Sequence, residues 1–317
     1  MIAACRMSRQ RRWLPMAALV SGLAAGSAAA AEDSALAVTQ IAPGVYVHQG
    51  SHAEIAEANR GAIANLGFVV GERCVAVIDT GGAPATGRAL RRAVRQVTRL
   101  PVCHVINTHV HPDHWLGNSA FEDDQPEFIG HARLPAQLAA RGPYYIAALQ
   151  RDTRFRYGPD ALVPPTRTVT DALELDLGGR RLRLEAMPPA HTDNDLVVTD
   201  LATGTLWLSD LLFVDRVPSL DGSLKGWLAV LDRLQGRDAA RAVPGHGPAS
   251  VAWPEAAAPL RRYLEALLDQ TRAAITAGAT LEEALERVAA AEAGNWKLFQ
   301  DYHPRNVGKA YAELEWE

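Results

Sequence analysis

The densest group of side chains able to bind a metal lies in the segment 107–114, which reads Asn-Thr-His-Val-His-Pro-Asp-His. Its pattern H-x-H-x-D-H comprises His109, His111, Asp113 and His114. Zinc in proteins accepts both imidazole nitrogen and carboxylate oxygen. His109 and His111 stand two positions apart in an extended run, so both can point toward one ion. Asp113 and His114 follow a proline, where the chain turns, and can face a second ion nearby.

Three later residues could complete such a site. His191 follows the apolar run 182–186 and a pair of prolines, and Asp210 ends the apolar run 206–209. His246 lies in a Pro-Gly-His-Gly turn that leaves the backbone little freedom. Any of these three alone would more often be structural, but their appearance together with H-x-H-x-D-H favours a shared metal site.

The elements that must position these residues read as alternating strands and helices. An apolar strand over 74–79, a helix over 86–100 and a strand over 102–107 form a β-α-β unit. The two strands should therefore be parallel, and the metal-binding segment stands directly after the second. Ligand sites in α/β sheets favour the carboxyl ends of strands.

The rest of the chain continues the same pattern. We predict strands at 45–47, 66–70, 127–129, 196–198 and 205–208, and a hairpin over 173–186. Helices are expected over 134–151, 228–234 and from 263 to Gly278, followed by another that Thr280 and Glu283 open with a capping box. Residues 32–317 are therefore predicted to form one α/β domain.

The first residues resemble a secretory signal peptide over 1–31. Four arginines precede an apolar run from Trp13 to Ala25, and small residues follow as far as Ala31. The apolar run is short for a membrane anchor, so no membrane span is expected in the mature chain. We predict a periplasmic protein, with Sec and Tat export both open. Loss of four arginines would move the net charge from -4 to -8.

Composition narrows the classes of protein further. Hydrophobic residues make up 48% and charged residues 21%, which is typical of a globular chain. The acidic balance lacks the basic excess of a nucleic-acid-binding protein, so a small-molecule substrate is expected and nucleic acid is not. Cys74 and Cys103 each stand five residues before a strand end. They could form a disulfide across neighbouring strands or remain buried thiols, and both interpretations stay open.

The order H-x-H-x-D-H, His, Asp, P-G-H-G resembles the metallo-β-lactamase superfamily, as does the strand end Val77 to Gly81. The resemblance implies an α/β fold of the four-layer αβ/βα sandwich type with a dinuclear metal site at one edge of the sheets. His109, His111 and His191 match ligands of the first metal, and Asp113, His114 and His246 match ligands of the second. Asp210 matches the bridging carboxylate typical of the glyoxalase II-like branch.

Segments 191–195, 211–227 and 302–306 are similar to those of periplasmic zinc metallohydrolases associated with sulfur-oxidation clusters and quinoprotein dehydrogenases. A quinoprotein dehydrogenase pathway is therefore a predicted partner. The resemblance implies two zinc ions, with iron or manganese as alternatives, because histidine-carboxylate sites accept all three metals. A metal-bridging hydroxide would cleave an ester, thioester or lactone, with Asp113 orienting it or accepting its proton.

Three other functions stay open: a β-lactamase-like amidase, an iron-dependent persulfide oxygenase and a non-catalytic metal-binding accessory protein. Around the site, Asp79 is expected to hold a ligating histidine or merely to cap its strand. Candidate substrate contacts are Arg216, Asp221, Lys225, Tyr144, Tyr145 and Arg151. His48, His104 and His131 are interpreted as structural, and Trp207 and Phe213 as core.

Overall fold

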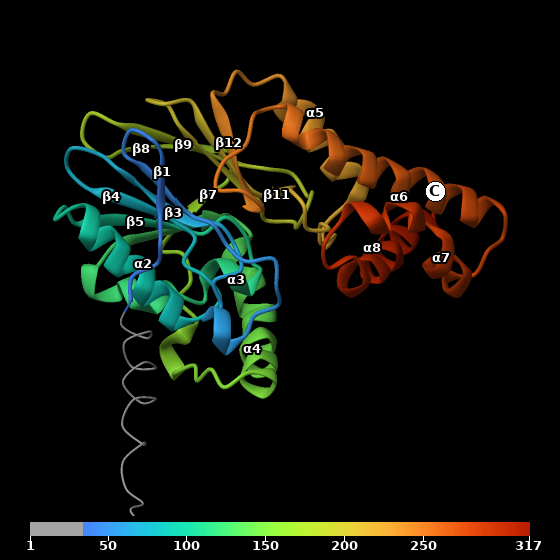
Figure 1. The fold of residues 1–317 in the computed structure, drawn as a ribbon, viewed down its shortest axis with the longest axis horizontal. Helices are drawn as coiled ribbons and strands as arrows, with labels where there is room; N and C mark the ends of the chain where they lie inside the picture. The colour runs from blue at the N-terminus through green and yellow to red at the C-terminus, as the bar shows by residue number, and fades with distance from the viewer. Residues whose placement is uncertain (1–33) are drawn as a thin grey trace, which may run out of the picture. The chain divides into compact units, whose positions relative to one another are not determined.

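The computed structural model describes residues 34–317, and Ala35–Glu317 form one compact unit built around two β-sheets (Figure 1). The predicted signal peptide, residues 1–31, lies outside the described residues. One sheet has seven strands in the order β1-β2-β3-β4-β5-β6-β7, and the other has five in the order β12-β11-β10-β9-β8.

The strands of the first sheet are β1 Thr39–Ala42, β2 Val45–His48, β3 Leu66–Val70, β4 Val75–Ile78, β5 Val102–Ile106, β6 Glu127–His131 and β7 Arg167–Val169. Those of the second are β8 Ala172–Asp176, β9 Arg181–Ala186, β10 Leu196–Asp200, β11 Thr205–Phe213 and β12 Arg241–His246. The α-helices are α2 Pro84–Val97, α3 Pro112–Trp115, α4 Leu134–Asp152, α5 Leu224–Gln235, α6 Ala258–Thr276, α7 Leu281–Arg287 and α8 Phe299–Leu314.

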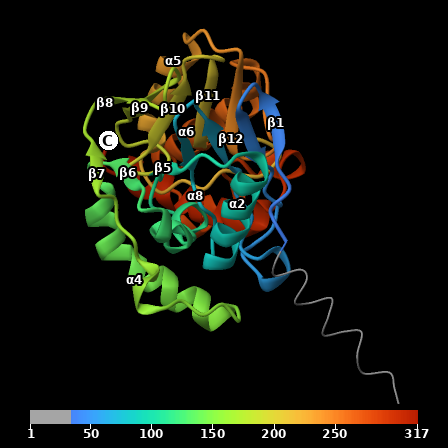
Figure 2. The same ribbon diagram turned by 90° about the vertical axis from the view of Figure 1, so that its left-hand side faces the viewer.

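Apolar side chains divide the unit into layers. A buried cluster that includes Ile106, Leu184 and Trp207 fills the space between the facing sheets. A second cluster packs α2 on the outer face of the seven-stranded sheet through Leu90 and Val94. A third packs α5, α6 and α8 on the outer face of the five-stranded sheet (Figures 1 and 2). The predicted four-layer αβ/βα sandwich is therefore confirmed.

The β-α-β unit forms as predicted: β4 precedes α2 in the chain, β5 follows it, and the two strands pair in parallel. β5 ends at Ile106, so the histidine-rich segment leaves the carboxyl end of a fully paired strand. The predicted turn at the proline is a one-turn helix, α3, that begins at Pro112. Proline suits this position because the first helical residue needs no N–H partner.

Several predicted boundaries hold, and some elements were not predicted. Gly278 adopts a left-handed conformation just after α6, and Thr280 opens α7 with the expected capping box. Helix α8 was not predicted, since Pro304 lies inside it and removes one backbone donor. The edge strand β7 was also missed, because it is short and largely exposed. No helix in residues 34–317 is both long and apolar enough to span a membrane.

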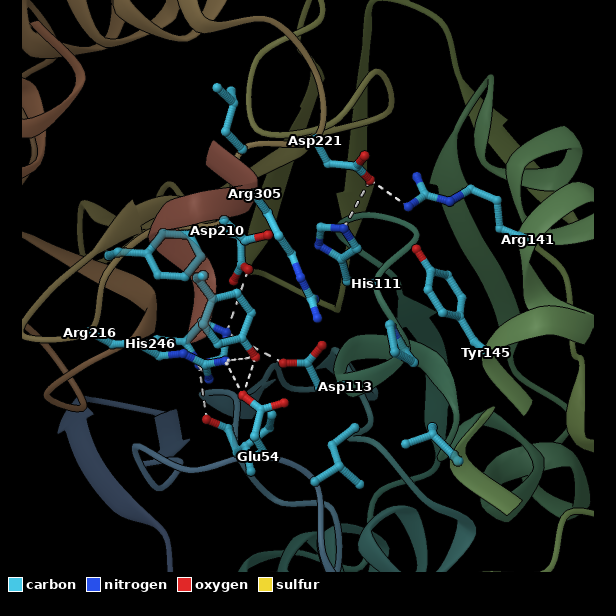
Figure 3. Close-up of a pocket in the computed structure, with 18 of the residues that line it drawn as sticks. Glu54, His111, Asp113, Arg141, Tyr145, Asp210, Arg216, Asp221, His246 and Arg305 are labelled. Atoms are coloured by element: carbon cyan, nitrogen blue, oxygen red, sulfur yellow. Dashed lines mark hydrogen bonds and ion pairs between the residues drawn. The ribbon is translucent and has the colours of Figure 1, made fainter. Parts of the chain in front are cut away.

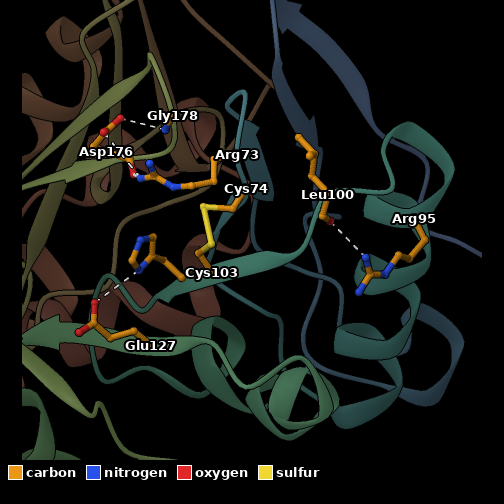
Figure 4. Close-up of a disulfide and its surroundings, with 9 residues drawn as sticks. Arg73, Cys74, Arg95, Leu100, Cys103, Glu127, Asp176 and Gly178 are labelled. Carbon is orange, nitrogen blue, oxygen red and sulfur yellow. Dashed lines mark hydrogen bonds and ion pairs between the residues drawn. A yellow bond between two sulfur atoms is a disulfide. The ribbon is translucent and has the colours of Figure 1, made fainter.

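Cys74 and Cys103 are joined by a disulfide (Figure 4), which decides between the two interpretations that the sequence left open. Their Cα atoms lie 5.8 Å apart, within the range that a disulfide spans. Cys74 directly precedes Val75, and Cys103 directly follows Val102. Because these two valines pair in the parallel register of β4 and β5, the cysteines lie close together on neighbouring segments. The covalent link therefore ties together the two strands that lead to the histidine-rich segment.

Reduction of this disulfide is expected to lower the free energy of unfolding by about 3 kcal/mol, because it releases a loop of 29 residues in the unfolded chain. Urea unfolding with and without reductant measures the difference. A variant with both Cys74→Ala and Cys103→Ala is the control, because reductant should leave its stability unchanged. Equal stability of the oxidised and reduced wild-type chain would contradict the assignment.

Candidate metal centre

The structure brings all seven predicted metal-binding residues together at one edge of the two sheets. His109 and His111 lie in the loop after β5, Asp113 and His114 in α3, His191 between β9 and β10, Asp210 in β11, and His246 at the end of β12. They form two groups able to hold an ion: His109, His111, His191 and Asp210 in one, and Asp113, His114 and His246 in the other. The six residues predicted for the two separate sets fall in these two groups, and Asp210, which was predicted to bridge both, belongs to the first group.

Donor atoms of the first group have the spacing expected around a single ion. His111 Nδ1 lies 3.2 Å from His109 Nε2 and 2.9 Å from His191 Nε2. Asp210 Oδ2 lies 3.4 Å from His191 Nε2 and 3.7 Å from His109 Nε2. Ligands bound tetrahedrally at zinc distances are separated by about 3.4 Å. The group therefore has a suitable size for a first-row divalent cation.

The second group lies against the same carboxylate and approaches both of its oxygens. Asp210 Oδ1 is 3.3 Å from His114 Nε2, and Asp210 Oδ2 is 3.5 Å from His246 Nε2. Asp113 Oδ2 is 3.4 Å from His246 Nε2 and 3.7 Å from His114 Nε2. Asp210 therefore lies between the two groups, in a position to contribute an oxygen to each.

Two buried atoms indicate that the residues fit a cation. His114 Nε2 and Asp210 Oδ1 are buried and lie 3.3 Å apart, but neither has a hydrogen bond of good geometry within residues 34–317. Leaving such polar atoms buried and unpaired costs about 1–3 kcal/mol each. A metal ion bound by both atoms would satisfy them.

The remaining ring nitrogens of the first group have partners that fix their orientation. His191 Nδ1 lies 2.6 Å from the carbonyl oxygen of Ser219, and His109 Nδ1 lies 3.0 Å from Thr108 Oγ1. His111 Nε2 lies 3.1 Å from Asp221 Oδ2. Metal-binding histidines usually donate their second N–H to such oxygens, which fixes the tautomer and the ring plane.

Asp79 holds the second group in place, as one of its two predicted roles required. Its Oδ2 accepts from His114 Nδ1 at 2.8 Å and from Thr108 Oγ1 at 2.8 Å, and its Oδ1 accepts from the Thr108 amide at 2.8 Å. Asp79 itself has a φ of 55°, which is unusual for a residue with a side chain. These hydrogen bonds connect β4, the loop after β5 and α3.

Gly245, the residue before His246, packs so closely against Asp210 that it has no room for a side chain. A Cβ atom at Gly245 would lie 1.8 Å from Asp210 Oδ1, so no other residue leaves room for the carboxylate. Asn65 fixes the same turn, donating to the carbonyl of Pro244 at 2.8 Å and to that of Pro248 at 3.1 Å. The sequence analysis did not identify Asn65, because only folding brings it to a turn so distant in the chain.

Arg216 lies beside the second group and is almost fully buried. Its Nη1 is 3.0 Å from His246 Nδ1, and its Nη2 donates to the Tyr302 hydroxyl at 2.7 Å. His246 Nδ1 is also 3.0 Å from the carbonyl oxygen of Ile63. A cation at Nε2 requires the proton on Nδ1, which then donates to Ile63. The guanidinium therefore does not serve as the donor to His246 when a metal is bound.

Burial sets the protonation of several of these groups. Desolvation lowers the pKa of His191 to about 3 and that of His109 well below its usual value, so both are neutral at pH 7. Burial alone would raise the pKa of Asp113, but His114 and His246 outweigh it and the pKa falls. Asp210 behaves in the same way, because the surrounding histidines lower its pKa. Neutral imidazoles and ionised carboxylates are the forms that bind metals.

The candidate site opens into a cavity of about 860 Å³ (Figure 3). His111, Asp113, Asp210 and His246 form part of its wall. Further side chains come from α4 and α8 and from the loop after β11: Arg141, Tyr145, Arg216, Asp221, Tyr302 and Arg305. A cavity of this size accommodates a small organic molecule.

The expected substrate contacts divide into two sets. Arg216, Asp221 and Tyr145 line the cavity, and among them Arg216 and Asp221 also contact the candidate ligands. The other three do not line it: Lys225 pairs with Glu317, Arg151 pairs with Asp152, and Tyr144 is 69% exposed. Sequence position on a loop or helix could not show which way these side chains turn.

The remaining interpretations hold, with one addition. His48, His104 and His131 belong to neither group, and each lies beside a backbone or carboxylate partner. Trp207 is buried between the sheets. Phe213 is buried too, and its ring stacks 5.1 Å from that of His246, so it packs a candidate ligand as well as the core.

Comparison with known proteins identifies the family. Residues 60–246, more than half of the chain, match the model of the metallo-beta-lactamase superfamily. The chain belongs to the metallo-beta-lactamase superfamily. A metallo-beta-lactamase from Pontibacter korlensis has the same fold, with a TM-score of 0.57 over 73% of this chain and 99% of that one at 20% identity.

Two curated relatives are similar in sequence. The chain is 25% identical over 253 residues to the linear primary-alkylsulfatase of Pseudomonas sp. (strain ATCC 19151), covering 67% of this chain and 47% of the relative. It is 27% identical over 182 residues to the 2,4-dinitroanisole O-demethylase subunit alpha of Nocardioides sp. (strain JS1661), covering 56% and 51%. The chain spans about half the length of these superfamily relatives.

We expect the purified protein, loaded with zinc and desalted, to retain about two ions per chain by elemental analysis. Asp210→Ala should lower this number, because the carboxylate borders both groups. Asp152→Asn is the control, since Asp152 lines the cavity but pairs with Arg151. Retention of two ions in the Asp210 variant would contradict a shared role.

Asp79→Asn should weaken metal binding by about 10- to 100-fold, the usual effect of losing the partner of a ligating histidine. An amide cannot accept from both Thr108 and His114 without turning its own N–H₂ toward a donor. Competition with a zinc indicator measures the affinity. Ser209→Ala is the matched control, since Ser209 contacts Asp79 less closely, at 3.3 Å. Equal affinities in the Asp79 and Ser209 variants would refute this role.

Proposed function

We propose that this member of the metallo-beta-lactamase superfamily is a metal-dependent hydrolase that cleaves an ester, thioester or lactone at a dinuclear zinc site. One observation carries the proposal: two groups of donor atoms meet at the Asp210 carboxylate in the wall of a cavity. The proposed ligands are His109, His111, His191, Asp113, His114, Asp210 and His246. Two ions bound there would polarise a substrate oxygen and lower the pKa of a bound water molecule.

Residues of the chain then supply orientation and proton transfer. Asp113 is ionised and lines the cavity, so it can orient a water molecule or accept its proton. Tyr145 also lines the cavity (Figure 3), and burial raises its pKa to about 12. Its phenol therefore keeps its proton at neutral pH and can donate a hydrogen bond to a substrate oxygen.

Zinc is proposed as the metal because five imidazoles and two carboxylates suit its preferred donors. Iron and manganese bind similar sets, so metal identity also depends on supply. The bridging position of Asp210 supports placement in the glyoxalase II-like branch. Export to the periplasm and a link to a quinoprotein dehydrogenase pathway are proposed from the sequence alone, with the disulfide as a supporting observation, because disulfides persist in oxidising compartments.

Sulfate-ester hydrolysis is the second candidate. Its support is the similarity to a linear primary-alkylsulfatase over 67% of this chain, together with arginines in the cavity wall. Arginine binds sulfate and phosphate oxygens through paired N–H donors. The two candidate functions would use the same metal centre and differ in the bond that is cleaved, which is a carboxylic ester, thioester or lactone in one and a sulfate ester in the other.

A panel of substrates assayed with the zinc-loaded protein tests the proposal. It contains carboxylic esters, thioesters, lactones, alkyl sulfates, phosphoesters and a chromogenic cephalosporin. We expect turnover of a carboxylic ester, thioester or lactone, and Asp113→Ala should lower kcat/KM by about 100-fold or more. The cavity-lining control Asp152→Asn should retain the rate.

Other results of the same panel identify the alternatives. High turnover of the cephalosporin alone would indicate an amidase, and turnover of alkyl sulfates alone would indicate a sulfatase. Oxygen consumption with a persulfide by the iron-loaded protein would indicate an oxygenase. Metal binding without turnover of any compound would indicate a non-catalytic metal-binding protein.

A further inference from the structure

The cavity contains four cationic side chains, and two of them are already engaged. Arg141 Nη2 pairs with Asp221 Oδ2 at 2.5 Å. Arg216 contacts His246 and Tyr302, and its guanidinium lies 4.9 Å from the centre of the Tyr302 ring. These two arginines are therefore already engaged by side chains of the cavity wall, Arg141 by Asp221 and Arg216 by Tyr302. The other two cations, Arg305 and Lys309, both come from α8.

Arg305 and Lys309 have no acidic partner among the ion pairs of residues 34–317. The guanidinium of Arg305 contacts only the face of Tyr302, 6.0 Å from its centre. Both side chains are exposed but line the cavity. Residues four apart in a helix lie one above the other on the same face, so the two charges are neighbours.

The acidic groups of the cavity cannot neutralise this pair. Asp113 and Asp210 belong to the candidate metal centre, and Asp221 is bonded to His111 and Arg141. Glu54 lies 3.9 Å from Arg216 Nη2 and accepts from the Tyr302 hydroxyl, and Asp152 pairs with Arg151. The cations of α8 are therefore the uncompensated charges of the cavity wall.

The same face of α8 leaves space for a ligand between these charges. Gly308 and Ala312 also line the cavity, so the α8 residues next to the two cations in the wall include two small ones. A Cβ atom added to Gly308 would meet nothing within 4 Å, which shows open space beside the helix. Figure 3 shows the Arg305 side chain extending into the cavity on the side of the candidate metal ligands.

We propose that Arg305 and Lys309 bind an anionic group of the substrate, of the carboxylate or sulfonate type, while the bond to be cleaved lies at the metal centre. This inference rests on the proposed hydrolase function and adds a substrate class to it. The guanidinium matches the two oxygens of such a group, and the ammonium of Lys309 adds a second charge. Arg305 and Lys309 are specificity-determining residues in this proposal and take no part in bond cleavage.

Paired substrates separate this role from catalysis. We compare the mononitrophenyl ester of glutaric acid, which carries a carboxylate, with the nitrophenyl ester of butyric acid, which is neutral. Arg305→Ala should raise KM for the anionic ester about tenfold or more, since the carboxylate would lose a charge-assisted hydrogen-bond donor. KM for the neutral ester and kcat for both should be retained, and Arg305→Lys should recover part of the affinity.

The matched control is Arg88→Ala, which removes an exposed arginine from α2 outside the cavity. It should change neither KM. An equal effect of Arg305→Ala on both esters, or no effect on either, would overturn the proposal. The melting temperatures of all variants show whether any loss reflects unfolding.

A binding measurement keeps the inference testable if neither ester is hydrolysed. The probe is a nitrophenyl alkyl ether that ends in a carboxylate, titrated calorimetrically into the zinc-loaded protein. Arg305→Ala should weaken its binding about tenfold relative to wild type and Arg88→Ala. Unchanged binding in the Arg305 variant would overturn the proposal whatever the activity, whereas weakened binding without turnover would contradict only the hydrolase assignment.

Discussion

The arrangement of the site depends on the Asp210 carboxylate, buried among imidazoles at separations of 3.3–3.7 Å. Burying an ionised carboxylate is unfavourable unless positive charge compensates it. The nearest nitrogens are Nε2 atoms, and His114 Nε2 has no hydrogen-bond partner in the described part of the chain. A divalent cation on each side, as proposed, would supply the missing charge and bind the unpaired atoms. A requirement for such cations would account for the many buried polar groups at this edge of the protein.

Both sheets contribute to holding that carboxylate, which explains the layered fold. Asp210 comes from β11, the strand next to the edge strand β12 in the five-stranded sheet, whereas His109 follows β5 of the seven-stranded sheet. The apolar cluster between the sheets fixes their separation. The disulfide links the beginning of β4 to β5 and so adds a covalent restraint on the two strands that lead to the site. Gly245 then allows β12 to approach Asp210 closely enough to present His246. Packing forces far from the site therefore set its ligand distances.

The residues of the cavity wall fall into two sets: those that contact the candidate ligands, and those that face the cavity as cations unpaired in the described part of the chain. Asp221 and Arg216 contact candidate ligands, so they orient the metal centre as well as line the cavity. Helix α8 contributes Arg305 and Lys309, which have no acidic partner among the ion pairs of residues 34–317. Membership of the metallo-beta-lactamase superfamily accounts for the shared core of residues 60–246. Helix α8 lies beyond those residues, so substrate selection can vary there without disturbing the metal centre.

The candidate metal-binding residues and most of the strands and helices could be predicted from the sequence, because both leave local signals. H-x-H-x-D-H is a dense and rare pattern, and the β4-α2-β5 unit shows clear apolar periodicity. Other features of the molecule depend on contacts between distant segments, which form only on folding. The pairing of Cys74 with Cys103 required the strand register. The roles of Asn65 and Arg305 required contacts between distant segments, and a lone asparagine or arginine carries no sequence pattern that identifies its partner. Side-chain direction, set by packing, also excluded Tyr144 from a cavity that Tyr145 enters.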